Sequence, residues 1–371
     1  MIRRLGWRLT APNRKPRDSS KMTRQSMLAS LSSLGVAIGA GLASALLFVV
    51  FARNGTMVAL CLAYFAPLPL IIASLGFGQW TGLVAAILGS FVTAIRLWPS
   101  VEFMYPVAIA YAVGIGIPAW LVCAAALRGA PPLESQTTRA PHQKVAPPVV
   151  PNPAPMRALA VAALYFPAAL SIAALALAAA HGGLNSALSQ LTAQVAPILR
   201  ELKEATSLPG GLDPDVLARI LVRIIVPAMA FSGLMLTAAN LWLGARIVQI
   251  SARLPTPWPD IPYNLRLPVP FAAALIPAIG LIFIGHEIGF VAAIAAASLA
   301  TALSLQGLAV MHDLTRGMST RTPLLFGAYL VMSIVVPPWP MAVFTVVGLV
   351  DAALGLRERK RLRQSASPPS P

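Results

Sequence analysis

One apolar stretch, residues 216–253, constrains the fold of this chain more than any other feature of its sequence. Its centre, residues 224–243, has about the 20 residues that a helix needs to cross the hydrocarbon core of a bilayer. Arg219 and Arg223 precede this centre, and Asn240 stands near its far end. Polar side chains inside lipid cost free energy, so they usually face protein or a cavity. The stretch is therefore predicted to be a transmembrane helix.

Composition extends this prediction to the whole chain. Of its 371 residues, 57% are hydrophobic and only 11% are charged, and the mean hydropathy is +0.75. These values lie outside the usual range of soluble globular domains. We therefore predict an all-α fold, a polytopic transmembrane helix bundle packed through small residues, with about 8–10 membrane segments.

The apolar runs follow one another along the chain. The prolines of residues 337–340 interrupt the last run, which forms either one broken span or two short ones. The run at 271–310 is too long for one crossing and is divided at Gly285, His286 and Glu287, so it is predicted to form two spans. The predicted membrane segments are residues 28–51, 57–77, 81–97, 101–127, 159–180, 224–243, 271–310 and 323–356.

Polar segments divide these runs into regions. The stretch 185–208 spaces its apolar residues at helical intervals and is predicted to be an extracytoplasmic amphipathic helix. The predicted regions are a basic cytoplasmic leader (1–27), an N-terminal four-helix membrane half (28–128), a Pro-rich cytoplasmic linker (129–157), a C-terminal membrane half (158–356) and a basic cytoplasmic tail (357–371).

The net charge of +16 reflects topology and gives no indication of nucleic-acid binding, because the basic residues stand in short runs beside apolar segments. An even number of crossings places the leader, the linker and the tail together on the side that is rich in Lys and Arg. An odd number would put the basic tail outside. We therefore predict a multi-pass protein of the bacterial inner membrane with both termini in the cytoplasm.

Two prolines and two amides are the candidate ligand-binding residues. Pro67 and Pro69 lie within one helical turn and must kink or break their helix, which frees backbone groups. The alternatives are a simple kink and an unwound turn that lines a site. With Asn240 and Gln306, these prolines are predicted to line one outward-open cavity for a small solute.

Asp351 is an acidic residue within an apolar run. It is predicted to form a structural ion pair with Arg357 or with a basic loop residue such as Arg246. The alternative is a role in moving a proton or binding a ligand.

The sequence contains few features of an enzyme. Gly285, His286 and Glu287 resemble half of a zinc-protease motif, but the second histidine is missing. The four histidines are scattered, and Cys61 and Cys123 lie in different apolar segments, where both are predicted to be free and buried. We expect no metal, no cofactor and no catalytic activity.

Several short patterns, taken in order, carry a family resemblance. They are residues 39–47, Pro67 and Pro69 with the glycine turn at 76–82, Asn240 followed by Arg246 and Arg253, residues 306–312, and residues 348–351 with Arg357. Over roughly residues 28–361 the chain resembles the YybS-like family, multi-pass bacterial membrane proteins catalogued as a domain of unknown function. That family is distantly similar to the substrate-binding subunits of energy-coupling-factor transporters, which implies transport, although a shared fold does not establish a function.

Three functions follow from these features. The first is transport, with a small solute bound in the bundle and a membrane protein or an ATPase module as partner. The second is a non-catalytic envelope scaffold whose basic surface binds protein partners and anionic lipid. A lipid-modifying enzyme ranks last, because it would need a cluster of acids or histidines at one interface.

Overall fold

The computed structural model describes residues 19–96, 101–129, 153–206, 213–334 and 339–366. The described chain is all-helical, 87% helix with no strand. Six helices are long and apolar enough to cross a membrane, namely Ser30–Asn54, Met57–Phe77, Tyr105–Leu127, Ala154–Ala180, Pro214–Ile250 and His286–Leu314. The prediction of an all-helical protein suited to a membrane bundle is therefore confirmed.

Apart from the 36-residue helix α1, the helices of the first half of the chain are short or broken. Prolines and glycines interrupt them, and a π-helical turn lies between α5 and α6. The elements are α1 (Ser19–Asn54), α2 (Met57–Tyr64), α3 (Pro67–Phe77), α4 (Gln79–Arg96), α5 (Val101–Tyr111), η1 (Ala112–Gly116) and α6 (Ile117–Leu127).

The second half contains the longest helix, α9. The apolar run 271–310 forms two helices, α11 and α12, separated by a turn in which Gly285 has a φ of 75°. The elements are α7 (Ala154–Ala180), α8 (Leu184–Thr206), α9 (Pro214–Ile250), α10 (Ile261–Asn264), α11 (Val269–Ile282), α12 (His286–Leu314), α13 (Arg321–Ile334), α14 (Trp339–Leu354) and α15 (Leu356–Ala366).

Parts of three predicted regions lie outside the described residues. They are the leader up to residue 18, most of the linker (130–152) and the end of the tail (367–371). Residues 335–338, which hold part of the proline interruption of the last run, lie outside as well.

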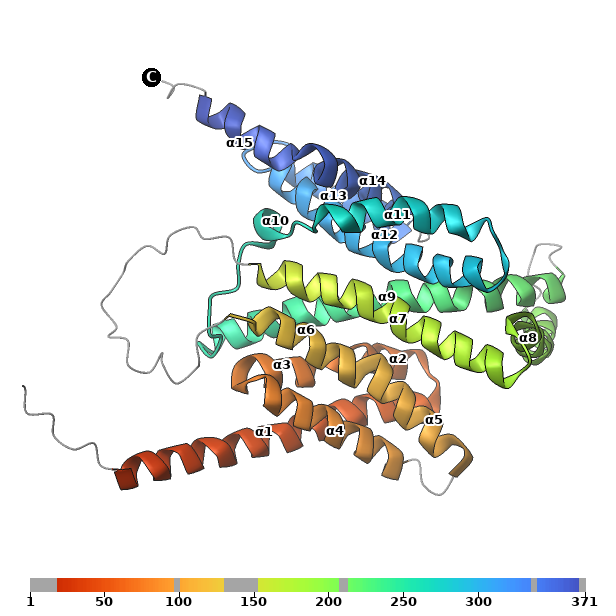
Figure 1. Cartoon of the computed structure of the whole chain (residues 1–371), viewed down its shortest axis with the longest axis horizontal. Helices are drawn as coiled ribbons and strands as arrows, with labels where there is room; N and C mark the ends of the chain where they lie inside the picture. Colours follow the sequence, from red (N-terminus) through yellow and green to blue (C-terminus); the bar gives the residue numbers. More distant parts are fainter. Residues whose placement is uncertain (1–18, 97–100, 130–152, 207–212, 335–338, 367–371) are drawn as a thin grey trace, which may run out of the picture.

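Helices α7 and α9 lie in the middle of the molecule (Figure 1). Helices α11 to α14 lie on one side of this pair and α1 to α6 on the other. The two halves of the chain meet where α6 packs against α7 and α3 packs against α9. Helix α8 lies at one end of the bundle, and α10, α15 and the start of α1 lie at the opposite end.

The amphipathic pattern of residues 185–208 corresponds to α8. This helix packs against α9 and α7, and it buries Ala187 and Ala196 while Ile198 and Leu202 stay exposed. Helix α8 thus keeps an apolar surface uncovered at the end of the bundle. Such a surface suits the boundary between lipid head groups and acyl chains.

The proline pair breaks the second apolar run into α2 and α3. The chain leaves the helix at Phe65 and Ala66, and Pro67 begins α3. A side chain satisfies a carbonyl on either side of the break, because Asn240 Nδ2 donates to the Tyr64 carbonyl at 2.9 Å and Ser44 Oγ donates to the Ala66 carbonyl at 2.6 Å. The break is therefore held by α9 and α1.

Helices α12 and α14 approach each other most closely at two glycines. A Cβ atom on Gly307 would collide with the Phe344 carbonyl, and one on Gly348 would collide with the Leu303 carbonyl. Backbones come this close in membranes only at small residues. The expectation for the cysteines is half wrong: Cys123 is buried, but Cys61 is exposed, because α2 packs mainly against α1 and leaves its other face open.

Candidate functional site

A cavity of about 540 Å³ lies between α7, α9 and α12. This volume is in the range of small-molecule sites in proteins. Almost all of its lining is apolar. The lining residues are Val122 of α6; Pro155, Ala158, Leu159 and Ala162 of α7; Met235, Thr237, Ala238, Ala239, Leu241 and Trp242 of α9; Trp258, Ile261, Pro262 and Leu265 around α10; Leu305, Leu308, Ala309 and His312 of α12; and Tyr329 of α13.

The cavity lies at one end of the helices that line it. It begins at Pro155, one residue into α7, and at His312, two residues before the end of α12. It reaches Ala162 and Leu305, which at 1.5 Å per residue is roughly 10 Å along each helix. That depth is about a third of the hydrocarbon thickness of a bilayer.

One wall of the cavity is buried and another is exposed. Ala158, Leu159 and Ala309 are at most 5% exposed, whereas Trp242 is 50% and Tyr329 46% exposed. The exposed lining residues belong to α9 and α13. The cavity is therefore open to the surface of the bundle on the side of these two helices.

Two polar side chains of the cavity meet at its outer end, while a third, Thr237, lies deeper along α9. His312 Nε2 and Tyr329 Oη are 2.8 Å apart and form a hydrogen bond between α12 and α13. Which of the two atoms donates depends on the histidine tautomer. None of the described side chains of α13 is buried, so this hydrogen bond is a main contact between α13 and the bundle.

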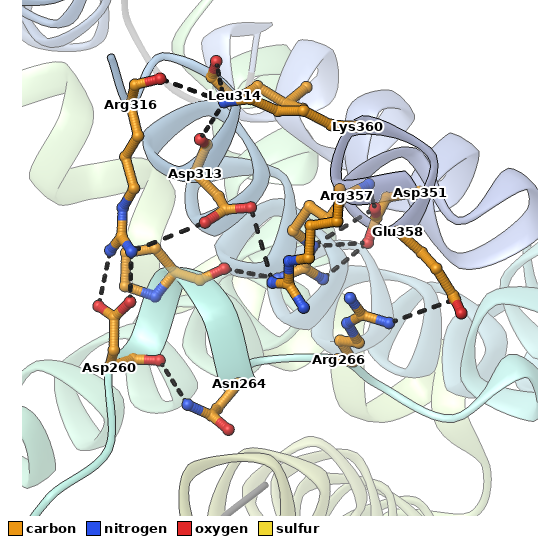
Figure 2. A network of polar contacts seen from close by, with 12 residues as sticks. Asp260, Asn264, Arg266, Asp313, Leu314, Arg316, Asp351, Arg357, Glu358 and Lys360 are labelled. Carbon is orange, nitrogen blue, oxygen red and sulfur yellow. Dashed lines mark hydrogen bonds and ion pairs between the residues drawn. The ribbon is translucent and has the colours of Figure 1, made fainter. Parts of the chain in front are cut away.

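A buried polar network lies behind the cavity wall (Figure 2). Arg357 is fully buried and its Nη2 atom lies 2.7 Å from Oδ2 of Asp351. The same guanidinium donates to the carbonyls of Pro262 at 2.8 Å and Leu265 at 2.9 Å. A charged pair taken out of water is stable only when its remaining donors and acceptors are satisfied, and here they are.

Gln306 completes this network. Its Nε2 atom donates to Asp351 Oδ2 at 3.0 Å, and its Oε1 atom accepts from the Leu267 backbone amide at 2.8 Å. Pro262 and Leu265 are themselves lining residues of the cavity. The network therefore attaches the segment around α10, which forms one wall of the cavity, to α12, α14 and α15.

A second layer of contacts docks α15 on the end of α12. Lys360 Nζ donates to the carbonyls of Asp313 and Leu314 at the end of α12 and of Arg316 just beyond it. The Arg361 guanidinium lies 3.6 Å from the centre of the Tyr263 ring. These contacts hold the charged helix α15 against the same end of the bundle (Figure 2).

Asp260 and Arg316 form an ion pair beside this layer, with Asp260 Oδ2 2.6 Å from Arg316 Nη1. The hydrogen bond that Arg316 donates to Asp260, more than the charge of Asp260, raises the pKa of the Arg316 guanidinium. Arg316 therefore stays cationic next to the polar end of the cavity.

The four predicted ligand-binding residues are not brought together around this cavity. Gln306 belongs to the buried network, and Asn240 bonds the Tyr64 and Leu236 carbonyls at the helix break. Pro67 and Pro69 lie in the first turns of α3. Both amides already use their donors on protein groups, which is why neither is available to line the cavity.

Of the predicted ion-pair residues, Asp351 and Arg357 are paired with each other and Arg246 is not part of the network. The Arg246 Nη1 atom donates to Gln249 Oε1 at 3.2 Å on the exposed face of α9. Among the described residues, no three His, Cys, Asp or Glu side chains are grouped as metal ligands would be.

Sequence reasoning missed the apolar lining of the cavity. Its residues are ordinary Ala, Leu and Trp of transmembrane helices, and nothing in their spacing separates a cavity from a packed interface. Neither His312 nor Tyr329 is among the predicted site residues. The signal that could have helped is that both are polar residues near the ends of apolar runs.

Comparison with known proteins found no matching family model, no matching curated protein and no matching solved structure.

Proposed function

We propose that this protein binds a small, mainly apolar molecule in the cavity between α7, α9 and α12, as a transport-related component of a membrane. One observation carries the proposal: a cavity of about 540 Å³ whose lining is almost entirely apolar. A packed bundle of this size rarely leaves such a space, since interiors are filled to crystal-like density. An unfilled apolar space can accept an apolar ligand at little desolvation cost.

The lining favours an apolar ligand over a polar solute. A polar solute needs hydrogen-bonding partners to replace those it gives up in water. The lining supplies few, and Asn240 and Gln306 are engaged elsewhere. An apolar ligand needs none of these partners.

The test is a cavity-filling substitution. Ala238 lines the cavity from α9, and Ala238→Phe should occupy the space that the ligand needs. Purified protein in mild detergent is examined by mass spectrometry for small molecules and proteins that co-purify. We expect an apolar molecule with the wild type and a loss of at least tenfold with Ala238→Phe.

The matched control is Ala228→Phe. Ala228 is exposed on the same helix and does not line the cavity. The Ala228→Phe protein should retain the co-purifying molecule at the wild-type level. Equal recovery from the wild type and the filled variant would overturn the proposal. Co-purification of an ATPase module with all three proteins would support a transport subunit in particular.

The finer aspects of topology and family belong to the same proposal. We infer a multi-pass protein of the bacterial inner membrane with 8–10 segments and with both termini cytoplasmic. This number is about as many as the lengths of its apolar helices allow. The side on which α10 and α15 lie would then be the cytoplasmic one, and α8 would be extracytoplasmic. Membership of the YybS-like family would agree with this arrangement.

A scaffold that binds anionic lipid or protein through the basic tail is the second candidate. Helix α15 does carry the cations that this role needs. However, Arg357, Lys360 and Arg361 are all held by partners within the chain. Of the described tail arginines, Arg359 is the exposed one, so fewer charges remain for an external partner than the sequence suggests.

A further inference from the structure

The position of the cavity relative to the helix ends says more about its ligand than its volume does. Its outer end lies level with the start of α7 and the end of α12, and its inner end lies roughly 10 Å deeper. In a bilayer the outer end would lie at the level of the head groups and the inner end among the acyl chains. A ligand that fills the cavity would span the same boundary.

The two ends differ in chemistry as well as depth. The inner end is formed by Ala162, Met235 and Leu305, all apolar. The outer end has the hydrogen-bonded pair His312 and Tyr329. An arrangement of this kind suits a molecule with a hydrocarbon chain and a polar head rather than a uniform hydrocarbon.

The charge around the outer end is positive. Arg316 follows the end of α12 by two residues and Arg321 is the first residue of α13, so both lie at this end of the bundle, and their charges act on the His312 ring. Asp260 forms an ion pair with Arg316, but no ion pair of Arg321 is found among the described residues. The carbonyls at the end of α12 would disfavour an anion, but Lys360 neutralises them.

Two half-exposed aromatic side chains line the cavity. Trp242 and Tyr329 flank it from α9 and α13, and both are about half exposed. Tryptophan and tyrosine are typical of the membrane interface. A ligand dissolved in the bilayer could therefore enter sideways without crossing the aqueous phase.

We propose that the cavity receives a single-chain amphiphile with an anionic head group, its chain between α7, α9 and α12 and its head beside His312, Tyr329 and Arg321. This inference rests on the proposed function, since it names the class of ligand for the same cavity. An anionic head would be attracted by the charge of Arg321. It would accept a hydrogen bond from Tyr329 Oη when His312 Nε2 carries the proton and donates to that hydroxyl, and a charge-assisted hydrogen bond of this kind is a strong one.

The experiment uses a brominated myristic acid as the probe and the intrinsic fluorescence of the full-length protein in detergent as the readout. Bromine on the chain quenches a nearby tryptophan, and Trp258 lines the cavity. The part of the quenching that disappears in Trp258→Phe reports on the cavity. Unbrominated myristic acid and myristyl alcohol, which share the chain and differ in the head, are then used as competitors.

We expect myristic acid to displace the probe at about tenfold lower concentration than myristyl alcohol, the difference that one charge-assisted hydrogen bond provides. Arg321→Gln and Tyr329→Phe should each reduce the ratio between displacement by the acid and displacement by the alcohol. Arg359→Gln, which removes an exposed arginine of α15, should keep the full preference.

The outcomes separate the two proposals. Equal displacement by acid and alcohol, with quenching that Ala238→Phe abolishes, would overturn the anionic head group and leave an apolar ligand in place. Quenching of Trp258 that Ala238→Phe does not change would overturn both. An acid preference that persists in Arg321→Gln and in Tyr329→Phe would also overturn the assignment of the head to this end.

Discussion

The guanidinium of Arg357 and the carboxylate of Asp351 form a fully buried ion pair with 2.7 Å between Nη2 and Oδ2. They are six positions apart in the sequence, with the end of α14 and the start of α15 between them. The chain turns at Gly355, which has a φ of 61°, and this turn brings the two side chains together. The pair is the point at which the tail, the α10 segment and α12 are joined.

Replacing Arg357 with Met should destabilise the fold by about 3–5 kcal/mol, since it leaves a carboxylate buried without its partner. The carbonyls of Pro262 and Leu265 would lose their donors too. Arg357→Lys should be only slightly more stable than Arg357→Met, because one ammonium cannot reproduce the planar guanidinium that reaches three acceptors. Thermal unfolding in detergent measures the loss, and Arg359→Met is the exposed control. Wild-type stability of Arg357→Met would refute a structural role for the pair.

Removing both charges of this pair should destabilise the fold less than removing one. In Asp351→Leu combined with Arg357→Met, no charge remains buried, and apolar replacement of a buried ion pair is often close to neutral. Part of the loss should remain, because the Leu265 carbonyl and Gln306 would still lack partners. The double variant should therefore unfold at a higher temperature than Arg357→Met alone. A double variant that is less stable than the single one would mean that the carbonyl contacts dominate.

The two substitutions of Asn240 should differ strongly. Asn240→Ala removes a hydrogen bond between helices, which in membranes averages about 0.6 kcal/mol. It also removes an Oδ1 atom that is buried without a partner among the described residues, so the net effect should be small. Asn240→Asp replaces the amide donors with carboxylate oxygens that face the Tyr64 and Leu236 carbonyls. Comparison of the two unfolding temperatures tests this, and equal values would contradict the assigned hydrogen bonds.

The close approach of α12 and α14 should tolerate no side chain at Gly307. A methyl group there would meet the Phe344 carbonyl, so Gly307→Ala should force the helices apart and cost about 1–3 kcal/mol. Gly280→Ala is the matched control, because Gly280 lies in α11 with open space around it. That control should be neutral or slightly stabilising. A Gly307→Ala protein as stable as Gly280→Ala would show that the helices are less tightly packed than described.

The elements of the fold follow closely from local sequence, because apolar run length and prolines act locally. The run 271–310 exceeds one crossing, and it forms α11 and α12 with a turn at Gly285. The prolines at 67 and 69 predicted a break, and the chain leaves the helix just before Pro67. Of the expected membrane segments, six are long enough by themselves to span a bilayer, and α13 and α14 are short.

The site was only partly accessible from the sequence. Asp351 stood out because a charge in an apolar run needs a partner, and Arg357 was the nearest candidate. The choice of Arg357 over Arg246 depended on the turn at Gly355, which the local pattern does not specify. Asn240 and Gln306 stood out for the same reason, but their polarity serves backbone groups of other segments, 176 and 39 residues away in sequence.

By itself, then, the sequence determined that this chain is helical and apolar enough for a membrane, where its helices break, and which polar groups must be satisfied inside it. Those properties depend on hydrophobicity, backbone geometry and desolvation cost, which act residue by residue. Only the tertiary structure decided which partner satisfies each polar group and where a cavity remains. Both depend on how helices distant in sequence pack together, and apolar side chains that fill a core look the same in a sequence as those that line a space.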